Sequence, residues 1–361
     1  MSLVLMATGA VTSVGHSVEA ACAAIRAGIS RPRKLREFRV VEEESQEDIP
    51  VSGHPIRGYT EGFQLIGRWL RLARGAVEDL LSHPNVSGRP AAFWEKTGLV
   101  VVTPPADDEV FLSAPGGSLE QIRESYLQPL HRSLGLAIAE PNVELISSGH
   151  AGTAAGLQHG QQWMASRGLE RVLLVAVDSY LDELLLQQLA SHRRLKTEDH
   201  PVGLMPGEAG VCLLVETDAS ARRRGEESAI RIDTIATGRE PDHFGSGRQN
   251  MGRGLAACIQ DVLSGLPSPF EGDVYADLNG EQWRSHEWGC VRVHLGTRLG
   301  AARLHLPVTY VGDVGAASGA LGVCLAAHDL SRGHGRQACS LVVSSSEHGA
   351  VGCMSLRRSN T

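Results

Sequence analysis

Short apolar runs separated by turn residues dominate the hydrophobic pattern of this chain. Three of these runs are continuous instead of alternating: Leu99–Val102, Val172–Val177 and Val211–Val215. A continuous run of this length indicates a strand that is buried on both faces, as in a parallel sheet covered by helices. The pattern therefore predicts an α/β protein.

The first part of the chain alternates strands with helical stripes. A strand at Leu3–Met6 precedes a helix that Ser17 caps and Gly28 ends. Apolar residues at helical spacing predict a helix at 64–82. Further helices are predicted between the apolar runs, near 119–136 and at about 152–167, the last one stopped by Gly168. Three segments have no apolar period: we expect a surface excursion at 31–60 and loops at 87–95 and 104–118.

The second part repeats this order of elements after the polar stretch Asp218–Ser228. Its predicted elements are a strand at 229–237, a helix at 252–263, a strand at 274–278, a helix near 281–288, a strand near Val308, a helix at 316–330 and strands at 339–344 and 351–356. We place two halves at 1–217 and 228–361, with surface insertions near 31–60 and 104–118 in the first, because 361 residues exceed one ordinary core.

Composition narrows the possible partners. The formal net charge is −7 and no basic tract is present, which argues against nucleic acid or an anionic membrane as a partner. The apolar runs are far below transmembrane length, and the N-terminus lacks the charged region of a signal peptide. Seven scattered cysteines are typical of reduced core thiols. We expect a cytoplasmic protein without a cofactor.

Five separated segments carry a family resemblance. They are Thr8–Glu19, Ser147–Asp178, Met205–Glu216, Tyr275–Glu281 and the glycine-rich Gly312–Gly322. Together, and in this order, they resemble the β-ketoacyl synthase branch of the thiolase superfamily. The resemblance implies a thiolase-like five-layer α/β/α/β/α fold built from two similar βαβαβ-type halves. It also implies a homodimer that pairs strands across a two-fold axis.

The catalytic positions of that family are replaced here. Alignment places the nucleophilic cysteine at Ala151, the first catalytic histidine at Asn279 and the second at Asp313. Condensation needs a thiolate to hold the acyl chain, which alanine cannot supply. An ionised Asp313 would repel the negative charge of the developing enolate. The resemblance therefore implies a degenerate enzyme that no longer condenses.

Five more residues are candidate members of the pocket: Ser148, His150, Glu281, Arg284 and His348. A serine nucleophile at 147 or 148 with His150 as base would need the two side chains to converge, and polar filling of the vacated pocket is the alternative. Glu281 and Arg284 share a helix face, with Trp283 and Trp288 nearby. They form either a new ligand site or a structural ion pair, and we favour the ion pair.

Other polar residues allow a plainer interpretation. Glu347 and His348 with Asp313 contain metal-ligand types, but their spacing favours a hydrogen-bonded network and we expect no metal. The polar stretches that carry His192, Arg193-Arg194, His200 and His243 are predicted to be solvated surface.

Two functions fit the sequence. The first is a non-condensing accessory subunit that binds a partner: a second copy, a sister condensing enzyme, an acyl carrier protein or another protein complex. Its precedent in the family is the chain-length-factor type of subunit, which lacks the cysteine. The second is an acyltransferase or thioester hydrolase with a replaced Asp or His base. An acid and a base converging on an open tunnel would favour the enzyme, and a pocket filled by side chains would favour the partner role.

Overall fold

The computed structural model describes residues 2–41, 46–106, 119–225 and 230–358. Within these residues, ten strands form one mixed sheet in the order β10-β9-β11-β12-β8-β1-β7-β6-β4-β5. The strands of the first half are β1 (Leu3–Thr12), β4 (Thr97–Thr103), β5 (Val143–Ser147), β6 (Arg171–Ser179) and β7 (Glu208–Thr217). Those of the second half are β8 (Ile230–Arg239), β9 (Asp273–Ala276), β10 (Arg303–His305), β11 (Cys339–Ser345) and β12 (Ala350–Arg358).

The two sets of five strands have the same topology. In each set the spatial order is third, second, fourth, fifth and first strand along the chain. The two pairings at the outer end are parallel and the two nearest the junction are antiparallel. The sets meet through a short pairing of β1 with β8. We therefore propose the division into 1–217 and 228–361 for the two halves.

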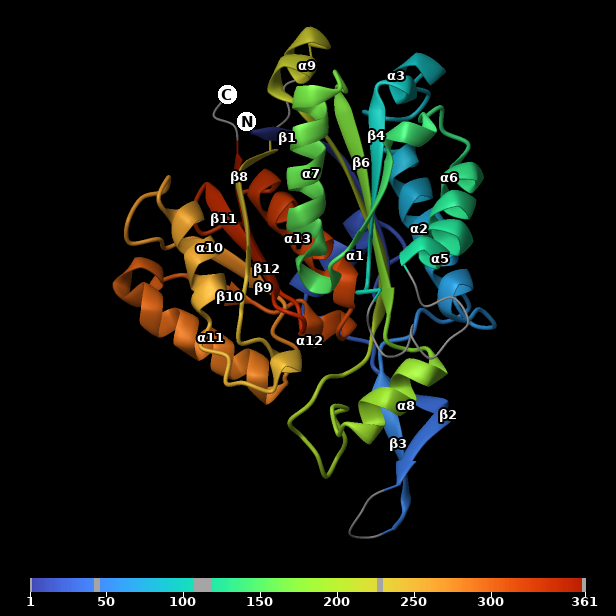
Figure 1. Cartoon of the computed structure of the whole chain (residues 1–361), viewed down its shortest axis with the longest axis vertical. Coiled ribbons are helices and arrows are strands. Elements are labelled where there is room, and N and C mark those ends of the chain that lie inside the picture. The colour runs from blue at the N-terminus through green and yellow to red at the C-terminus, as the bar shows by residue number, and fades with distance from the viewer. Residues whose placement is uncertain (1, 42–45, 107–118, 226–229, 359–361) are drawn as a thin grey trace.

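The two sets of strands alternate with three layers of helices, which gives five layers in all (Figure 1). On the outer face of the first half lie α2 (Leu65–Ser82), α3 (Ala91–Glu95), α5 (Leu119–Ile122) and α6 (Gln128–Leu134). Between the two sets of strands lie α1 (Val18–Arg26), α7 (Gly152–Ser166) and α13 (Ser318–Ser331). On the outer face of the second half lie α10 (Arg253–Leu263) and α11 (Gln282–Leu295). The protein thus has the expected thiolase-like α/β architecture.

The two central helices, α7 and α13, have unusual sequences that reflect how closely they are packed. Helix α13 has hardly any polar stripe because sheets or helices cover most of its faces. Helix α7 approaches the sheet closely through glycines. A Cβ at Gly152 would lie 2.3 Å from a Val102 methyl carbon, and one at Gly156 would lie 2.9 Å from Leu174. Small residues at these positions therefore set the distance between helix and sheet.

Strand direction was predicted only in part. The apolar runs in β4, β6 and β7 are strands buried on both faces, as expected. However, β6 and β7 pair antiparallel, so the sheet is mixed and the expectation of a parallel sheet was wrong for β7. The physical reason is that helices cover both faces of these strands. An apolar run reports that burial and not the direction of the neighbouring strand.

Several predicted elements need correction. The excursion at 31–60 contains a hairpin of β2 (Arg33–Val41) and β3 (Asp48–Gly53), which projects at the bottom of Figure 1. The supposed loop at 87–95 contains α3, and of the segment 104–118 only 104–106 lie within the described residues. The region near Val308 is the helix α12 (Val308–Val311), because Pro307 favours a helix start. The strand lies earlier, at β10, whose Arg and His hide it from an apolar search.

Other elements are longer than expected or were missed. Strand β1 continues to Thr12 through Gly9, where a Cβ would lie 2.2 Å from the Ala76 carbonyl oxygen of α2. The helix near 119–136 is α5 and α6 joined by a π turn at Arg123–Leu127. Not predicted were β5, α8 (Glu183–Ser191) and α9 (Asp218–Arg223).

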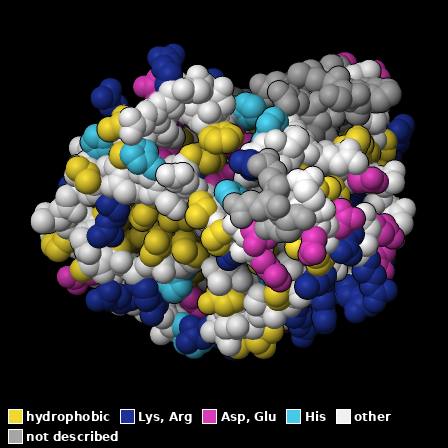
Figure 2. Space-filling model, turned by 90° about the horizontal axis from the view of Figure 1, so that it is seen from below, with side chains coloured by type: hydrophobic (Ala, Val, Ile, Leu, Met, Phe, Trp, Pro, Cys, Tyr) yellow, Lys and Arg dark blue, Asp and Glu magenta, His cyan; other side chains and the backbone are white. Residues whose placement is uncertain are grey.

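The surface agrees with the charge pattern of the sequence. On the face shown in Figure 2, hydrophobic side chains gather in a patch on the left, and basic side chains at the lower right lie beside acidic ones. Across the described ranges, none of the helices combines the length and apolar content needed to cross a membrane.

His54 gives a pH-dependent stability that can be measured. It is 1 % exposed, and burial lowers its pKa from 6.5 to about 4. The unfolded chain therefore takes up the proton first, and this group reduces stability as the pH falls from about 6.5 to about 4, by up to about 3 kcal/mol. Urea unfolding of wild type and His54→Phe at pH 7, 5.5 and 4.5 tests this. The stability of wild type should fall more steeply, and parallel curves would contradict the assignment.

Candidate functional site

The turn that begins α7 carries His150 and Ala151. Strand β5 ends at Ser147, and a 3₁₀ turn at Gly149–Ala151 leads into the helix. Gly149 has φ +56°, and a Cβ there would lie 3.2 Å from both Pro105 and Ser346, so the turn favours glycine. The N–H of Ala151 donates to Ser346 Oγ at 3.2 Å. A backbone donor at the start of a buried helix is therefore already occupied.

Asp313 is fixed from the backbone outward. Its N–H donates to the Met205 carbonyl, and its own carbonyl accepts from the N–H of Gly207. A Cβ at Gly207 would lie 2.2 Å from the Val311 carbonyl oxygen, so this contact requires glycine. The turn before β7 thus holds the segment before α13 in place and directs the Asp313 side chain into the interior, where it is 2 % exposed.

The Asp313 carboxylate accepts three hydrogen bonds. His150 Nε2 donates at 2.8 Å, Asn279 Nδ2 at 2.6 Å and the Gly315 N–H at 2.9 Å. Burial alone would raise the pKa of Asp313, but His150, Arg284 and Asn279 outweigh it and hold the pKa well below its usual range. The structure thus brings together the positions aligned with both family histidines. The backbone donor to Asp313 lies just before α13, at Gly315.

Arg284 closes the other side of His150. This arginine is 1 % exposed, donates to the Ser345 carbonyl at 2.6 Å and lies 3.4 Å from Asp277 Oδ2. Its NH2 is 3.2 Å from both ring nitrogens of His150, and Nδ1 is the free acceptor because Nε2 donates to Asp313. Burial and Arg284 lower the pKa of His150, but Asp313 outweighs both and leaves it raised.

The predicted Glu281–Arg284 ion pair was wrong. Glu281 is bound by Arg194, whose Nε and NH2 donate to its two carboxylate oxygens at 2.6 and 2.9 Å. Glu281 precedes the first residue of α11, so the helical spacing that favoured the pair does not apply to it. Arg194 also binds Glu347, at 2.8 and 2.7 Å. Sequence reasoning had placed Arg194 on the solvated surface, but its side chain is only 11 % exposed.

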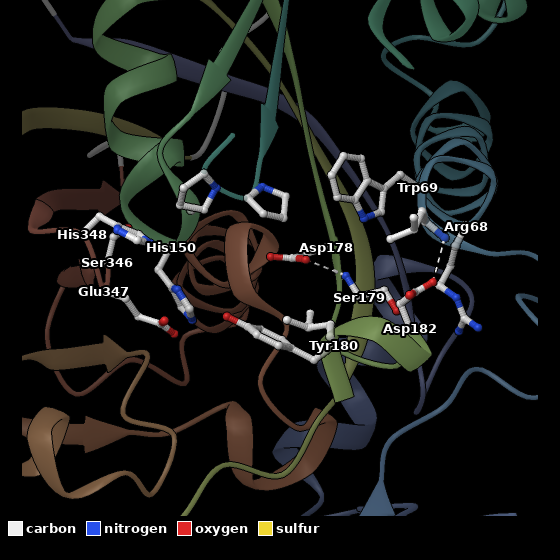
Figure 3. A pocket seen from close by; sticks show the side chains of 15 residues that line it. Arg68, Trp69, His150, Asp178, Ser179, Tyr180, Asp182, Ser346, Glu347 and His348 are labelled. Carbon is white, nitrogen blue, oxygen red and sulfur yellow. Dashed lines mark hydrogen bonds between the residues drawn. The ribbon is translucent and has the colours of Figure 1, made fainter. Parts of the chain in front are cut away.

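The remaining candidates line or flank a small cavity of about 30 Å³ (Figure 3). His150, Ser346, Glu347 and the half-buried His348 lie on one side of it, and Trp69, Arg68 and Asp182 on the other. The Ser148 carbonyl accepts from Ser346 Oγ at 2.5 Å, whereas the Ser148 side chain does not line the cavity. His348 contacts neither Asp313 nor Ala151 by any hydrogen bond among the described residues. These same residues contain no cluster of three or more side chains that could hold a metal ion.

Asp178 is a cavity residue for which sequence reasoning proposed no role. It accepts from the N–H groups of Ala316 and Ser179, at 2.8 and 2.7 Å. Burial nevertheless raises its pKa to about 7, and the negative charge of Asp313 adds a smaller upward contribution. Its position at the end of a buried strand is the only sequence signal for this residue.

Comparison with known proteins identifies the architecture. No family model and no curated protein sequence matches the chain. Among solved structures, a type II PKS acyl-carrier protein in complex with its ketosynthase, AntDE:AntF, aligns with a TM-score of 0.78 at 14 % identity, covering 99 % of both chains. The chain has the ketosynthase fold.

Two more structures with the ketosynthase fold match over nearly the full length. The ishigamide ketosynthase/chain length factor aligns with a TM-score of 0.73 at 16 % identity, and a β-ketoacyl synthase from Burkholderia phymatum STM815 with 0.73 at 14 %. Each alignment covers 99 % of this chain and 99 % of the other. At such low identity the fold is shared, and the function has to be argued from the site.

Asp313→Asn should change both stability and the protonation of His150. The amide N–H of asparagine would face the three donors that now bind the carboxylate. We therefore expect the free energy of unfolding, measured in urea, to fall by about 1–3 kcal/mol. Without the carboxylate, burial and Arg284 dominate, and the pKa of His150 should fall below its ordinary value. NMR titration of the His150 ring measures this directly. The control is Asp48→Asn at an exposed position, and an unchanged His150 titration would refute the coupling.

Proposed function

We propose that this chain is a cytoplasmic, non-condensing protein with the ketosynthase fold, which acts as an accessory or partner-binding subunit. One observation carries the proposal. At the positions aligned with the catalytic set, Asn279 and Asp313 bind each other and Asp313 binds His150, while Ala151 offers no nucleophile. The polar groups at these positions are engaged with one another instead of pointing at a substrate.

The chemistry of condensation has lost three of its requirements at this site. Ala151 cannot form a thioester. The backbone donor of Ala151 is held by Ser346 Oγ, so an acyl oxygen would have to displace that hydroxyl. Asp313 has a strongly lowered pKa and carries a negative charge, which would repel an enolate. Each loss alone would slow condensation, and together they argue against it.

The size of the cavity supports a partner role over a substrate role. A volume of about 30 Å³ holds one water molecule, whereas pockets for small ligands measure about 300–1,000 Å³. Side chains such as Arg284 and His150 occupy the interior instead. The site therefore resembles a packed junction between the two halves more than a substrate pocket.

The partner is proposed to be another protein chain. One of the similar structures is described as a ketosynthase with its acyl-carrier protein, and another as a ketosynthase/chain length factor. In this chain β5 is the last strand of the sheet and pairs only with β4 among the described residues. A free edge of this kind can pair with a second copy or with a sister subunit. A homodimer is the simplest form, with a sister condensing enzyme or an acyl carrier protein as further partners.

A hydrolase or acyltransferase is the second candidate. The observation in its favour is the His150–Asp313 pair at 2.8 Å beside Asp178, whose pKa is raised to about 7. Against it, both nitrogens of His150 are engaged, and within the described part of the chain no hydroxyl or thiol is hydrogen-bonded to His150. A base without a neighbouring nucleophile would have to activate water.

Acyl uptake separates these functions. We expect the purified chain to take up no radiolabelled acyl group from acyl-CoA or acyl carrier protein, because Ala151 has replaced the nucleophile. Asp313→His alone should restore nothing, and activity should require at least Ala151→Cys together with Asn279→His. Stable labelling of wild type near residue 151 would overturn the proposal. Hydrolysis of the thioester that Asp313→Asn abolishes would establish the second candidate.

Light scattering tests the partner arrangement. We expect a homodimer at micromolar concentration, because the fold leaves the β5 edge available for pairing. A stable monomer would count against it. Aggregation that a co-expressed sister subunit prevents would indicate a heterodimer instead.

A further inference from the structure

A surface groove lies close to the buried site but does not reach it. The groove has a volume of about 510 Å³ and is lined by His192, His200, Phe244 and Trp283, among others. Phe244 and Trp283 stack with ring centroids 5.2 Å apart. A space of this size could admit a small ligand, whereas the inner cavity could not.

The groove and the inner cavity share one wall. Arg194 and Glu281 line the groove, and Glu347 and His150 line the inner cavity. Arg194 joins the two sides because it binds Glu281 and Glu347 at the same time, through four hydrogen bonds of 2.6–2.9 Å. The Arg194 pKa is raised: burial would lower it, but the two carboxylates outweigh burial. The contacts are therefore charge-assisted and strong.

We propose that Arg194, Glu281 and Glu347 form an ionic plug that closes a passage from the surface groove to the His150–Asp313 pair. The proposal rests on the proposed function, since it explains how a non-condensing site stays closed. Removing the plug joins the two spaces and admits small molecules to the inner site. An intact plug confines any ligand of the groove to the surface.

The backbone of Arg194 is prepared for this position. Arg193 adopts φ +53°, a left-handed conformation that is strained for a non-glycine residue. This turn ends α8, and the Arg194 N–H donates to the Leu189 carbonyl at 2.8 Å, as in a Schellman motif. The Arg194 carbonyl accepts from Leu204 N–H at 2.8 Å. The backbone of Arg194 is thus held through both its N–H and its carbonyl, in addition to the contacts of its side chain.

The plug is also connected to the inner pair. Asn279 Nδ2 donates to Glu281 Oε2 at 2.9 Å and to Asp313 Oδ2 at 2.6 Å. A change at Arg194 therefore reaches His150 through only Glu281, Asn279 and Asp313. Opening the plug should alter the inner site as well as uncover it.

A purely structural brace would look similar, so the test needs a matched control. Arg171 provides it: the side chain is 4 % exposed and lies 2.6 Å from Glu170 and 3.9 Å from Glu216. It does not line the groove or the inner cavity. Breaking this second cluster reduces stability by a comparable mechanism, but it opens no passage.

The experiment measures access to a thiol in the inner cavity. Ser346→Cys places a reporter on its wall, in a Cys290→Ser background because the other described cysteines are buried. Arg194→Met/Glu347→Gln removes the plug and conserves the net charge, and Arg171→Met/Glu170→Gln is the control. The probe is iodoacetamide, with the rate followed by mass spectrometry at matched folded fraction.

We expect the plug variant to be alkylated at least about tenfold faster than the reporter alone, and the control variant at the unchanged rate. Equal rates in the folded plug variant and the reporter would overturn the proposal, as would equal acceleration in both variants. If the double variant does not fold, Arg194→Lys replaces it, with a smaller acceleration expected because lysine lacks the bidentate fork. The readout involves no acyl chemistry, so it is independent of a failure of the proposed function.

Discussion

The buried carboxylate of Asp313 is the constraint on which the centre of this molecule depends. An ionised carboxyl that is 2 % exposed is tolerated only if donors surround it. His150 comes from the start of α7, Asn279 from the turn after β9 and Gly315 from the turn before α13. Each of these donors must reach one point, so the carboxylate fixes how the central helices and the second set of strands meet.

Charge balance extends this constraint outward. Four carboxylates, those of Asp277, Glu281, Asp313 and Glu347, face the guanidinium groups of Arg194 and Arg284. The surplus of negative charge explains why the pKa of His150 is raised despite its burial. For Asp178, which has no cation in direct contact among the described residues, burial is the main cause of the raised pKa and the charge of Asp313 a smaller one.

The sequence predicts the architecture better than the network. Continuous apolar runs locate the central strands, and segments of small residues locate α7 and α13, because burial and close packing leave a direct mark on composition. Aligned motifs indicate Asn279 and Asp313, which the structure places in contact. Strand β10 and hairpin β2–β3 leave no such mark, because they are short or exposed. Strand β10 is placed by its pairing with β9, and β2 and β3 are placed by their pairing with each other.

Arg194 shows why the rest of the site could not be predicted. Its partners lie 87 and 153 residues away, and most of its neighbours in sequence, such as His192, Arg193 and Lys196, are polar. Only the fold brings the end of α8 against the turns at Glu281 and Glu347. A local sequence pattern predicts the helix or strand to which a residue belongs. The ion pairs of Arg194 depend instead on the tertiary structure, which brings the ends of three separate segments together.

The difference between a catalytic site and a packed junction lies in unused bonding capacity. A catalytic site keeps donors, acceptors and space available for a substrate. Here the Ala151 N–H, the His150 ring and the Asp313 carboxylate all have protein partners, and the space left holds one water. Arg284 Nε is an exception, since it is buried without a partner in the described structure. At the place where these elements converge, the polar side chains of this chain therefore mostly bind each other.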